Sequence, residues 1–288
     1  MARVSFVARL RRVGGALLWL ALFAAVGIGT TIVLSNVIPG LGGRPWWLAR
    51  NGLYQLAGFL AATWLVGRVA NGYSWAWMGW RAPRTLPRHF LRGVGLGAAM
   101  AGGAILLAVL SDGATVRTTG TGGFGAVAGP LAVGLLAAAL SEELMFRGYP
   151  LRRLADALGP GLAIVVLALA FGAAHLANPD AGIVSTTNIA LAAVWLAAAF
   201  FSSGGMALAW GLHFGWNATL SLLFDAPVSG IAFDVPGVDY LAGRHAWIDG
   251  GRFGPEGGVI GTLVLIVGVV LVVGRQARTP RRWLAEAA

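Results

Sequence analysis

Two adjacent carboxylates, Glu142 and Glu143, lie near the end of a long apolar run, in the stretch AALSEELMFRGYPLRR. Neighbouring side chains on a helix point about 100° apart, so the two cannot face one target equally. Glu143 and Arg147 are four residues apart with the acid first, which is the favourable order for a helical ion pair. We therefore predict an orienting salt bridge between Glu143 and Arg147, which leaves Glu142 free to act as a general base.

Three more polar side chains lie in apolar stretches, His175 in one and the pair His213 and Asn217 in another. An ionisable group at mid-bilayer costs about 2.5–3.5 kcal/mol on insertion scales, so such a group usually faces the bundle interior and has a function. A purely structural alternative is that these residues only join helices by hydrogen bonds. A helix presents His213 and Asn217 on one face, as two donors that could stabilise an oxyanion. With His175 to orient a water and Glu142 as base, the set predicts hydrolysis by an activated water, without a serine or cysteine nucleophile.

The elements that position these residues are predicted to be membrane helices. Hydrophobic residues make up 57% of the 288 residues and charged residues only 11%, and the mean hydropathy is +0.75. A soluble domain would have about 25% charged residues. We predict an all-α, polytopic membrane helix bundle that is a single domain over 1–288, with a catalytic core at about 125–224. About eight transmembrane helices, each able to cross about 30 Å of hydrocarbon, are expected at 14–37, 52–71, 93–111, 125–146, 161–177, 186–202, 206–224 and 258–274.

The charged residues indicate the topology. All 21 basic residues are arginines; with the amino terminus inside, 16 fall in inner segments and 5 in outer ones, which predicts both termini in the cytoplasm. We attribute the net charge of +10 to this topology and to contact with anionic lipid headgroups, not to nucleic acid. Arginine without lysine indicates a GC-rich bacterial genome. We expect a multi-pass protein of the bacterial inner membrane. The absence of cysteine excludes disulfides, thiol nucleophiles and thiolate zinc sites.

A helical hairpin is predicted to bring Glu142 and His175 together. Each lies roughly 16 residues from the Gly-Pro turn at 159–160, so at 1.5 Å per residue the two reach the same height on antiparallel arms. In this prediction the first arm continues as one helix to about Ala157, with Pro150 as an interior point of strain.

The remaining segments are predicted to be structural. The longest outer segment, 225–257, is rich in Gly and Pro, and we expect an irregular cap without chemistry; its acids are Asp225, Asp234, Asp239, Asp249 and Glu256. The glycine-rich TGTGGFG at 119–125 lacks the Gly-Lys-Ser/Thr ending of a phosphate loop and is expected to be a flexible turn. The small residues of GVGLGAAMAGG at 93–103 predict a helix-packing surface.

Three motifs carry a resemblance to a known family. SEELMFRG fits E-E-x-x-x-R-G, FGAAH at 171–175 fits F-x-x-x-H, and HFGWN at 213–217 fits H-x-x-x-N. In this order, each inside an apolar span, they resemble the CAAX-protease and bacteriocin-processing family of intramembrane glutamic endopeptidases, which is related to the eukaryotic Ras-converting CAAX endoprotease. The resemblance covers about 125–224.

The resemblance also implies roles for the motif residues. It implies that Glu142 activates water without an obligatory metal, that His175 assists, and that His213 and Asn217 form the oxyanion hole. Phe171 is expected to pack. Eukaryotic members remove the last three residues of prenylated CaaX proteins, whereas a bacterial host would offer few such substrates.

We therefore expect an intramembrane endopeptidase that acts in the lipid bilayer on membrane-associated peptides or proteins, lipidated or CaaX-like ones among them. No nucleic acid and no cofactor are expected, and the sequence makes no prediction of oligomeric state. Three alternatives stay open. One is a non-catalytic membrane scaffold or bacteriocin-immunity-type protein of the same fold. Another is a zinc hydrolase that uses Glu and His ligands, although no H-E-x-x-H is present. The third is a proton-coupled transporter.

Overall fold

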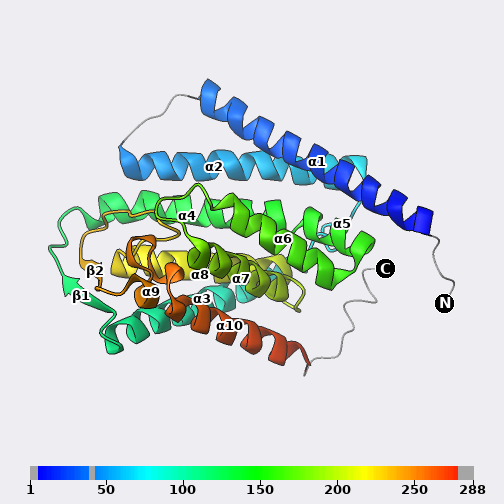
Figure 1. Ribbon diagram of the computed structural model, residues 1–288. Helices are drawn as coiled ribbons and strands as arrows, with labels where there is room; N and C mark the ends of the chain where they lie inside the picture. Colours follow the sequence, from blue (N-terminus) through cyan, green and yellow to red (C-terminus); the bar gives the residue numbers. More distant parts are fainter. Residues whose placement is uncertain (1–5, 39–42, 278–288) are drawn as a thin grey trace.

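The computed structural model describes residues 6–38 and 43–277 and shows an almost entirely helical bundle (Figure 1). All eight segments that the hydropathy indicates are helical. The long helices are α1 (Phe6–Val37), α2 (Arg44–Ala62) with its π-helical continuation η1 (Thr63–Ala70), α3 (Leu86–Leu110), α4 (Phe124–Phe146), α6 (Pro160–Ala174), α7 (Ile183–Phe200), α8 (Gly205–Ala218) with η3 (Thr219–Leu223), and α10 (Val259–Ala277). The short helices between them are η2 (Pro83–Thr85) and α5 (Tyr149–Leu158).

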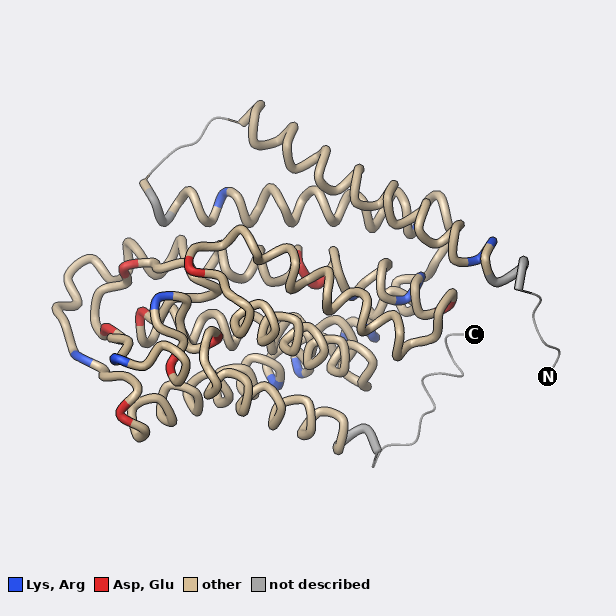
Figure 2. The backbone as a smooth tube through the Cα atoms, in the orientation of Figure 1, with Lys and Arg blue, Asp and Glu red and all other residues tan. Residues whose placement is uncertain are grey.

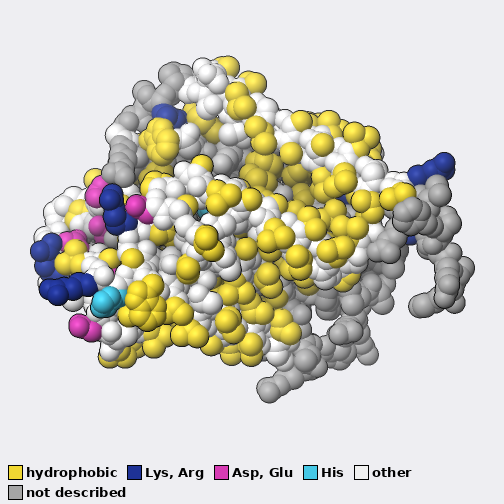
Figure 3. Space-filling view, viewed as in Figure 1, with side chains coloured by type: hydrophobic (Ala, Val, Ile, Leu, Met, Phe, Trp, Pro, Cys, Tyr) yellow, Lys and Arg dark blue, Asp and Glu magenta, His cyan; other side chains and the backbone are white. Residues whose placement is uncertain are grey.

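Apolar length supports a membrane bundle. Five helical stretches are long and apolar enough to cross a membrane by length and composition: Leu10–Val37, Trp46–Ala70, Pro83–Leu110, Phe124–Leu158 and Ile183–Phe200. Two shorter apolar helices, Pro160–Ala174 and Val259–Gly274, accompany them. Hydrophobic side chains cover the flank of the bundle in Figure 3, and the charged side chains visible there lie at its ends. This distribution suits a flank in contact with lipid, and the protein is a polytopic helical membrane bundle.

The central helix of the bundle is α8, which packs against α3, α4 and α7. On one side, α1 and α2 form a layer that lies against α4, and on the other side α10 packs against α7 (Figure 1). Helix α1 begins and α10 ends at the end of the bundle that carries α5, whereas the strands lie at the opposite end. Most acidic positions also lie at the strand end (Figure 2).

Glycines allow α3 and α8 to approach closely. A Cβ built on Gly97 of α3 would lie 2.3 Å from the carbonyl oxygen of Leu212, and one built on Gly215 of α8 would lie 2.4 Å from that of Val94. Real side chains do not tolerate such distances, so the two backbones are in direct contact because both residues are glycine. This confirms the packing surface predicted from the small residues at 93–103, and it fixes the helix that carries His213 and Asn217.

The chain breaks where the sequence predicted a continuous helix. Helix α4 ends at Phe146 and does not reach Ala157, because the amides of both Arg147 and Gly148 donate to the carbonyl of Glu143, at 2.8 and 3.0 Å. A new helix, α5, then starts with Pro150 in its first turn. Proline has no amide proton to donate and its ring clashes with a preceding helical carbonyl, so the first turn of a separate helix accommodates it without strain. The prediction of an interior strain point at Pro150 was therefore wrong.

Residues 225–257, called the cap segment below, are more regular than predicted. They contain β2 (Val238–Ala242), α9 (Ala246–Asp249), η4 (Gly251–Phe253) and η5 (Pro255–Gly257). Strand β2 pairs antiparallel with β1 (Ala114–Thr118), with Val116 opposite Tyr240. The fully buried Asp249 accepts hydrogen bonds from the amides of Gly243 and Gly251, at 2.5 and 2.9 Å. The segment is thus a packed cap on the bundle.

Candidate active site

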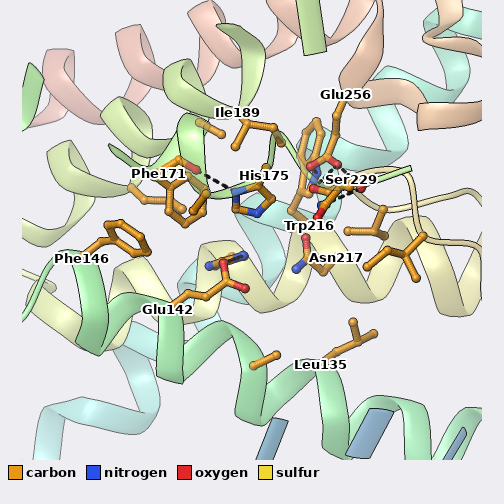
Figure 4. Close-up of a pocket in the computed structure, with 18 of the residues that line it drawn as sticks. Leu135, Glu142, Phe146, Phe171, His175, Ile189, Trp216, Asn217, Ser229 and Glu256 are labelled. Carbon is orange, nitrogen blue, oxygen red and sulfur yellow. Dashed lines mark hydrogen bonds and ion pairs between the residues drawn. The ribbon is translucent and has the colours of Figure 1, made fainter. Parts of the chain in front are cut away.

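A cavity of about 380 Å³ lies inside the bundle, lined by residues of α2, α4, α6, α7, α8, α10 and the cap segment. The four residues that sequence reasoning nominated for chemistry, Glu142, His175, His213 and Asn217, all line it. Figure 4 shows Glu142 on one side of this cavity and Glu256 on the other, with His175 and Asn217 between them. The structure therefore gathers these four side chains, from three helices, around one space.

The two glutamates differ in environment, as their spacing predicted. The side chain of Glu142 is 25% exposed and borders the cavity, whereas that of Glu143 is fully buried. Oε1 of Glu143 lies 3.2 Å from Nη1 of Arg147, so the predicted ion pair forms, with Arg147 only 2% exposed. The two charges stabilise each other, because either charge alone would be strongly destabilised in this buried position.

Glu143 has a second partner that the sequence did not indicate. Nδ1 of His213 lies 2.9 Å from the same Oε1 atom. Because a carboxylate only accepts hydrogen bonds, Nδ1 of His213 is the donor, and the other ring nitrogen, Nε2, lies 3.7 Å from Oε2 of Glu142. Glu143 thus connects the first motif to the third and fixes the orientation of the His213 ring.

His175 directly follows α6 as its C-cap, and its orientation is also fixed by a hydrogen bond. Nδ1 lies 2.8 Å from the carbonyl oxygen of Phe171, which can only accept, so Nδ1 carries a proton; in the neutral ring, Nε2 is then an acceptor. The structure describes both Glu142 and His175 and contains no direct hydrogen bond between them. The predicted meeting of these two residues is therefore limited to a shared cavity, and Oε2 of Glu142 lies 3.7 Å from Nε2 of His213.

Phe171 packs at the centre of this arrangement. Its ring centroid lies 4.7 Å from that of His175 and 6.3 Å from that of His213. The guanidinium carbon of Arg147 lies 4.4 Å from the same centroid, which is a cation–π distance. Phe171 therefore supports three polar residues of the site through contact, which agrees with the expectation that it packs.

On α8, His213 and Asn217 are one turn apart and both face the cavity. Among the described residues no hydrogen bond is formed by the side-chain amide of Asn217, so its donors are available to a bound molecule. The indole of Trp210, on the same helix, donates to the carbonyl of Leu136 on α4 at 3.0 Å. This contact holds α8 against the helix that carries the two glutamates.

Sequence reasoning missed four polar residues of the cavity wall, Gln55, Asn178, Ser229 and Glu256. Gln55 on α2 reaches the cavity, with its Oε1 atom 3.2 Å from Oγ of Ser141. Ser229 and Glu256 enter from the cap segment. Gln55 could have been found, because an uncharged amide within an apolar span is itself a signal. Ser229 and Glu256 could not, since they lie in a Gly- and Pro-rich stretch without helical periodicity. In the part of the chain that the structure describes, no group of three His, Cys, Asp or Glu residues could hold a metal ion.

The sequence model of the Type II CAAX prenyl endopeptidase Rce1-like family matches residues 124–219. This stretch forms an Rce1-like domain. The match begins at the first residue of α4, ends at the first residue of η3 and contains all three motifs. The resemblance stated from the motifs is therefore confirmed at the level of the family. A comparison with curated proteins gave no match for the chain.

The Rce1-like domain supplies α4, α6, α7 and α8, but the cavity is completed by elements on either side of it. Gln55 lies on α2, which precedes the domain in the sequence, whereas the cap segment and α10 follow the domain. The surroundings of the motif residues are thus set partly by segments that the family match does not cover.

Proposed function

We propose that this chain is an intramembrane endopeptidase that hydrolyses a peptide bond of a membrane-associated substrate, lipidated or CaaX-like, with a water activated by Glu142. The observation that carries the proposal is the position of Glu142. Its side chain is partly exposed and borders the cavity, close to His213, within an Rce1-like domain. A carboxylate whose neighbour Glu143 already neutralises Arg147 is free to accept a proton from water.

The reaction follows from the donors and acceptors around the cavity. Water, held between Glu142 and the acceptor nitrogen of His175, gives a proton to Glu142, and its oxygen attacks the carbonyl carbon of the scissile bond. His213 and Asn217 donate to the oxyanion of the tetrahedral intermediate. When the C–N bond breaks, Glu142 returns the proton to the departing nitrogen, so that the water is divided between the new carboxyl group and the new amine.

This role assigns a charge to His213. Its Nδ1–H is already donated to Glu143, so Nε2 carries a proton only when the ring is an imidazolium. The carboxylates of Glu142 and Glu143 lie 3.7 and 2.9 Å from the two ring nitrogens. An imidazolium at this position can donate from Nε2 into the cavity. No step uses a metal ion, and we propose that the enzyme needs none.

We place the protein in the bacterial inner membrane with both termini in the cytoplasm, as the arginine distribution indicates. The apolar lining contributed by residues such as Leu131, Leu135 and Ile189 suits an apolar or lipid-bearing peptide.

The experiment that tests the proposal uses the purified protein in proteoliposomes. A farnesylated peptide with a CaaX ending and the same peptide without lipid are the probes, and product formation is measured by mass spectrometry. We expect the wild type to cleave at least the farnesylated probe. Glu142→Gln, which keeps the shape of the side chain but cannot take the proton, should lower the rate by about 10³-fold or more. Asp239→Asn, the same change at an acid outside the cavity, is the control and should retain the rate. A Glu142→Gln protein as active as the control would contradict the proposal.

A further inference from the structure

The cap segment brings a second carboxylate, Glu256, to the wall of the cavity, outside the Rce1-like domain. Its residue is only 5% exposed. The described part of the chain contains no ion pair to Glu256. A buried carboxylate without a cation must be stabilised by hydrogen-bond donors, and the identity of those donors indicates what the side chain does.

Three neutral donors satisfy Glu256. The indole Nε1 of Trp216 donates to Oε1 at 2.9 Å, and both the amide and the hydroxyl of Ser229 donate to Oε2, at 2.6 and 2.9 Å. These bonds are visible in Figure 4. The backbone of Glu256 is also held: the side-chain amide of the buried Asn188 on α7 donates to the carbonyl oxygen of Glu256 at 2.8 Å. Both the backbone and the side chain of Glu256 are therefore fixed.

The donors lie directly beside the two walls of the proposed site. Trp216 immediately precedes Asn217 on α8. Ser229 accepts a hydrogen bond through its carbonyl from the amide group of Asn178, at 2.9 Å, and the backbone amide of Asn178 in turn donates to the carbonyl of His175 at 3.1 Å. The pair Ser229 and Glu256 thus bridges the loop after His175 and the helix that carries Asn217.

The backbone at Ser229 and Gly230 has an uncommon conformation, with a positive φ at both residues. Ser229 has a φ of +49°, a left-handed conformation that is uncommon for residues other than glycine. The next residue, Gly230, has a φ of +83°, and a Cβ built there would lie 2.1 Å from the carbonyl oxygen of Pro179. The cap segment is therefore pressed against the loop that follows His175. Non-glycine residues keep such a conformation only where surrounding contacts determine it, and here those contacts are the bonds to Glu256 and Asn178.

We propose that Ser229 and Glu256 are positioning residues of the hydrolytic site, which act as a clamp that sets the separation of His175 and Asn217. The proposal rests on the proposed function, because it concerns how the water-orienting and oxyanion-binding sides of that site are held apart. The clamp acts through Asn178 on one side and Trp216 on the other.

The test compares Glu256→Gln with a matched variant, Asp249→Asn, in kinetics with the farnesylated peptide. Asp249 is also a buried carboxylate of the cap segment held by amides, but it does not line the cavity. In Glu256→Gln an amino group replaces one oxygen, so at least one of the three donors loses its acceptor. We expect kcat to fall by about 10- to 100-fold with KM within about twofold, since small misplacements of catalytic groups have effects of this size. Asp249→Asn should leave kcat per folded molecule unchanged. Equal kcat values in the two variants would overturn the proposal.

A second comparison separates positioning from general loss of structure. If Glu256 acts through Asn217, then Glu256→Gln should lower kcat much less in an Asn217→Ala background than in the wild type. If Glu256→Gln lowers kcat by the same factor in the Asn217→Ala background as in the wild type, Glu256 does not act through Asn217. That result would contradict the part of the proposal that concerns Asn217.

A readout without catalysis keeps the clamp testable when no peptide is cleaved. Hydrogen exchange of the folded Glu256→Gln protein should be faster than that of the wild type in both 175–179 and 213–219, and unchanged there in Asp249→Asn. Unchanged exchange in both segments of Glu256→Gln would refute the clamp. A wild type that cleaves no probe but shows the expected exchange would instead refute the proposed function alone.

Discussion

His213 donates a hydrogen bond from Nδ1 to Oε1 of Glu143 over 2.9 Å, and the same oxygen lies 3.2 Å from Nη1 of Arg147. One buried carboxylate therefore serves two cationic or donor side chains, one on its own helix and one on α8. The bond to His213 leaves Nε2 of that ring facing Glu142, at 3.7 Å. Glu143 supports the proposed chemistry by orienting the residues that perform it.

Glu143→Gln should be destabilising as well as inactivating. The substitution leaves the guanidinium of Arg147 buried without a counter-charge, and breaking a buried ion pair costs about 3–5 kcal/mol. We expect a clearly lower unfolding temperature in detergent. Asp239→Asn breaks the exposed pair with Arg117 and should cost less than about 1 kcal/mol. A Glu143→Gln protein as stable as Asp239→Asn would show that the buried pair is not needed for the fold.

Removal of one proposed oxyanion donor should lower kcat and leave KM nearly unchanged. Asn217→Ala takes away a side-chain donor that faces the cavity, and loss of one such donor costs about 10²–10³ in kcat. His245→Gln, at an exposed position of the cap segment, is a control expected to show no change. An Asn217→Ala protein with a wild-type kcat would remove Asn217 from the site.

The glycine contact between α3 and α8 should not tolerate a methyl group. Gly97→Ala places a Cβ 2.3 Å from the carbonyl of Leu212, so the helices must separate, at a cost of about 1–3 kcal/mol or more. Gly95→Ala on the same helix has nothing within 4 Å and should be neutral or slightly stabilising, because alanine favours a helix over glycine. The two unfolding temperatures are compared in detergent, and equal values would contradict the observed backbone contact.

Metal removal should leave the activity unchanged. The proposed water is activated by Glu142 alone, so incubation with a strong chelator followed by the peptide assay should give the untreated rate. A loss of activity that zinc restores would favour a metal-assisted hydrolase with Glu142 and His213 among its ligands.

Much of this architecture could be predicted because it is local in the sequence. Apolar length gave the helices, and the i, i+4 spacing gave the pair of Glu143 with Arg147. The Gly-Pro turn at 159–160 placed Glu142 and His175 on arms that do border one cavity. The contact of Glu143 with His213 could not be predicted, since it depends on how α8 rotates against α4.

Two further features follow from tertiary structure and give no periodic signal. The sequence around Pro150 is compatible both with one helix that is kinked at Pro150 and with two separate helices. In the structure, α4 ends at Phe146 and a new helix begins at Tyr149. Ser229 and Glu256 reach the cavity because the cap segment folds back onto the bundle. In the sequence they are ordinary polar residues among glycines and prolines, 27 positions apart.

The role of Glu142 is tested most directly by a comparison of peptide termini, by mass spectrometry, in membranes from cells that express the wild type, Glu142→Gln or Asp239→Asn at equal levels. If Glu142 activates the water, a set of new carboxyl termini should occur with the wild type and Asp239→Asn and disappear with Glu142→Gln. Termini that persist unchanged with Glu142→Gln would contradict an endopeptidase that depends on this carboxylate, and would favour a membrane scaffold of the same fold.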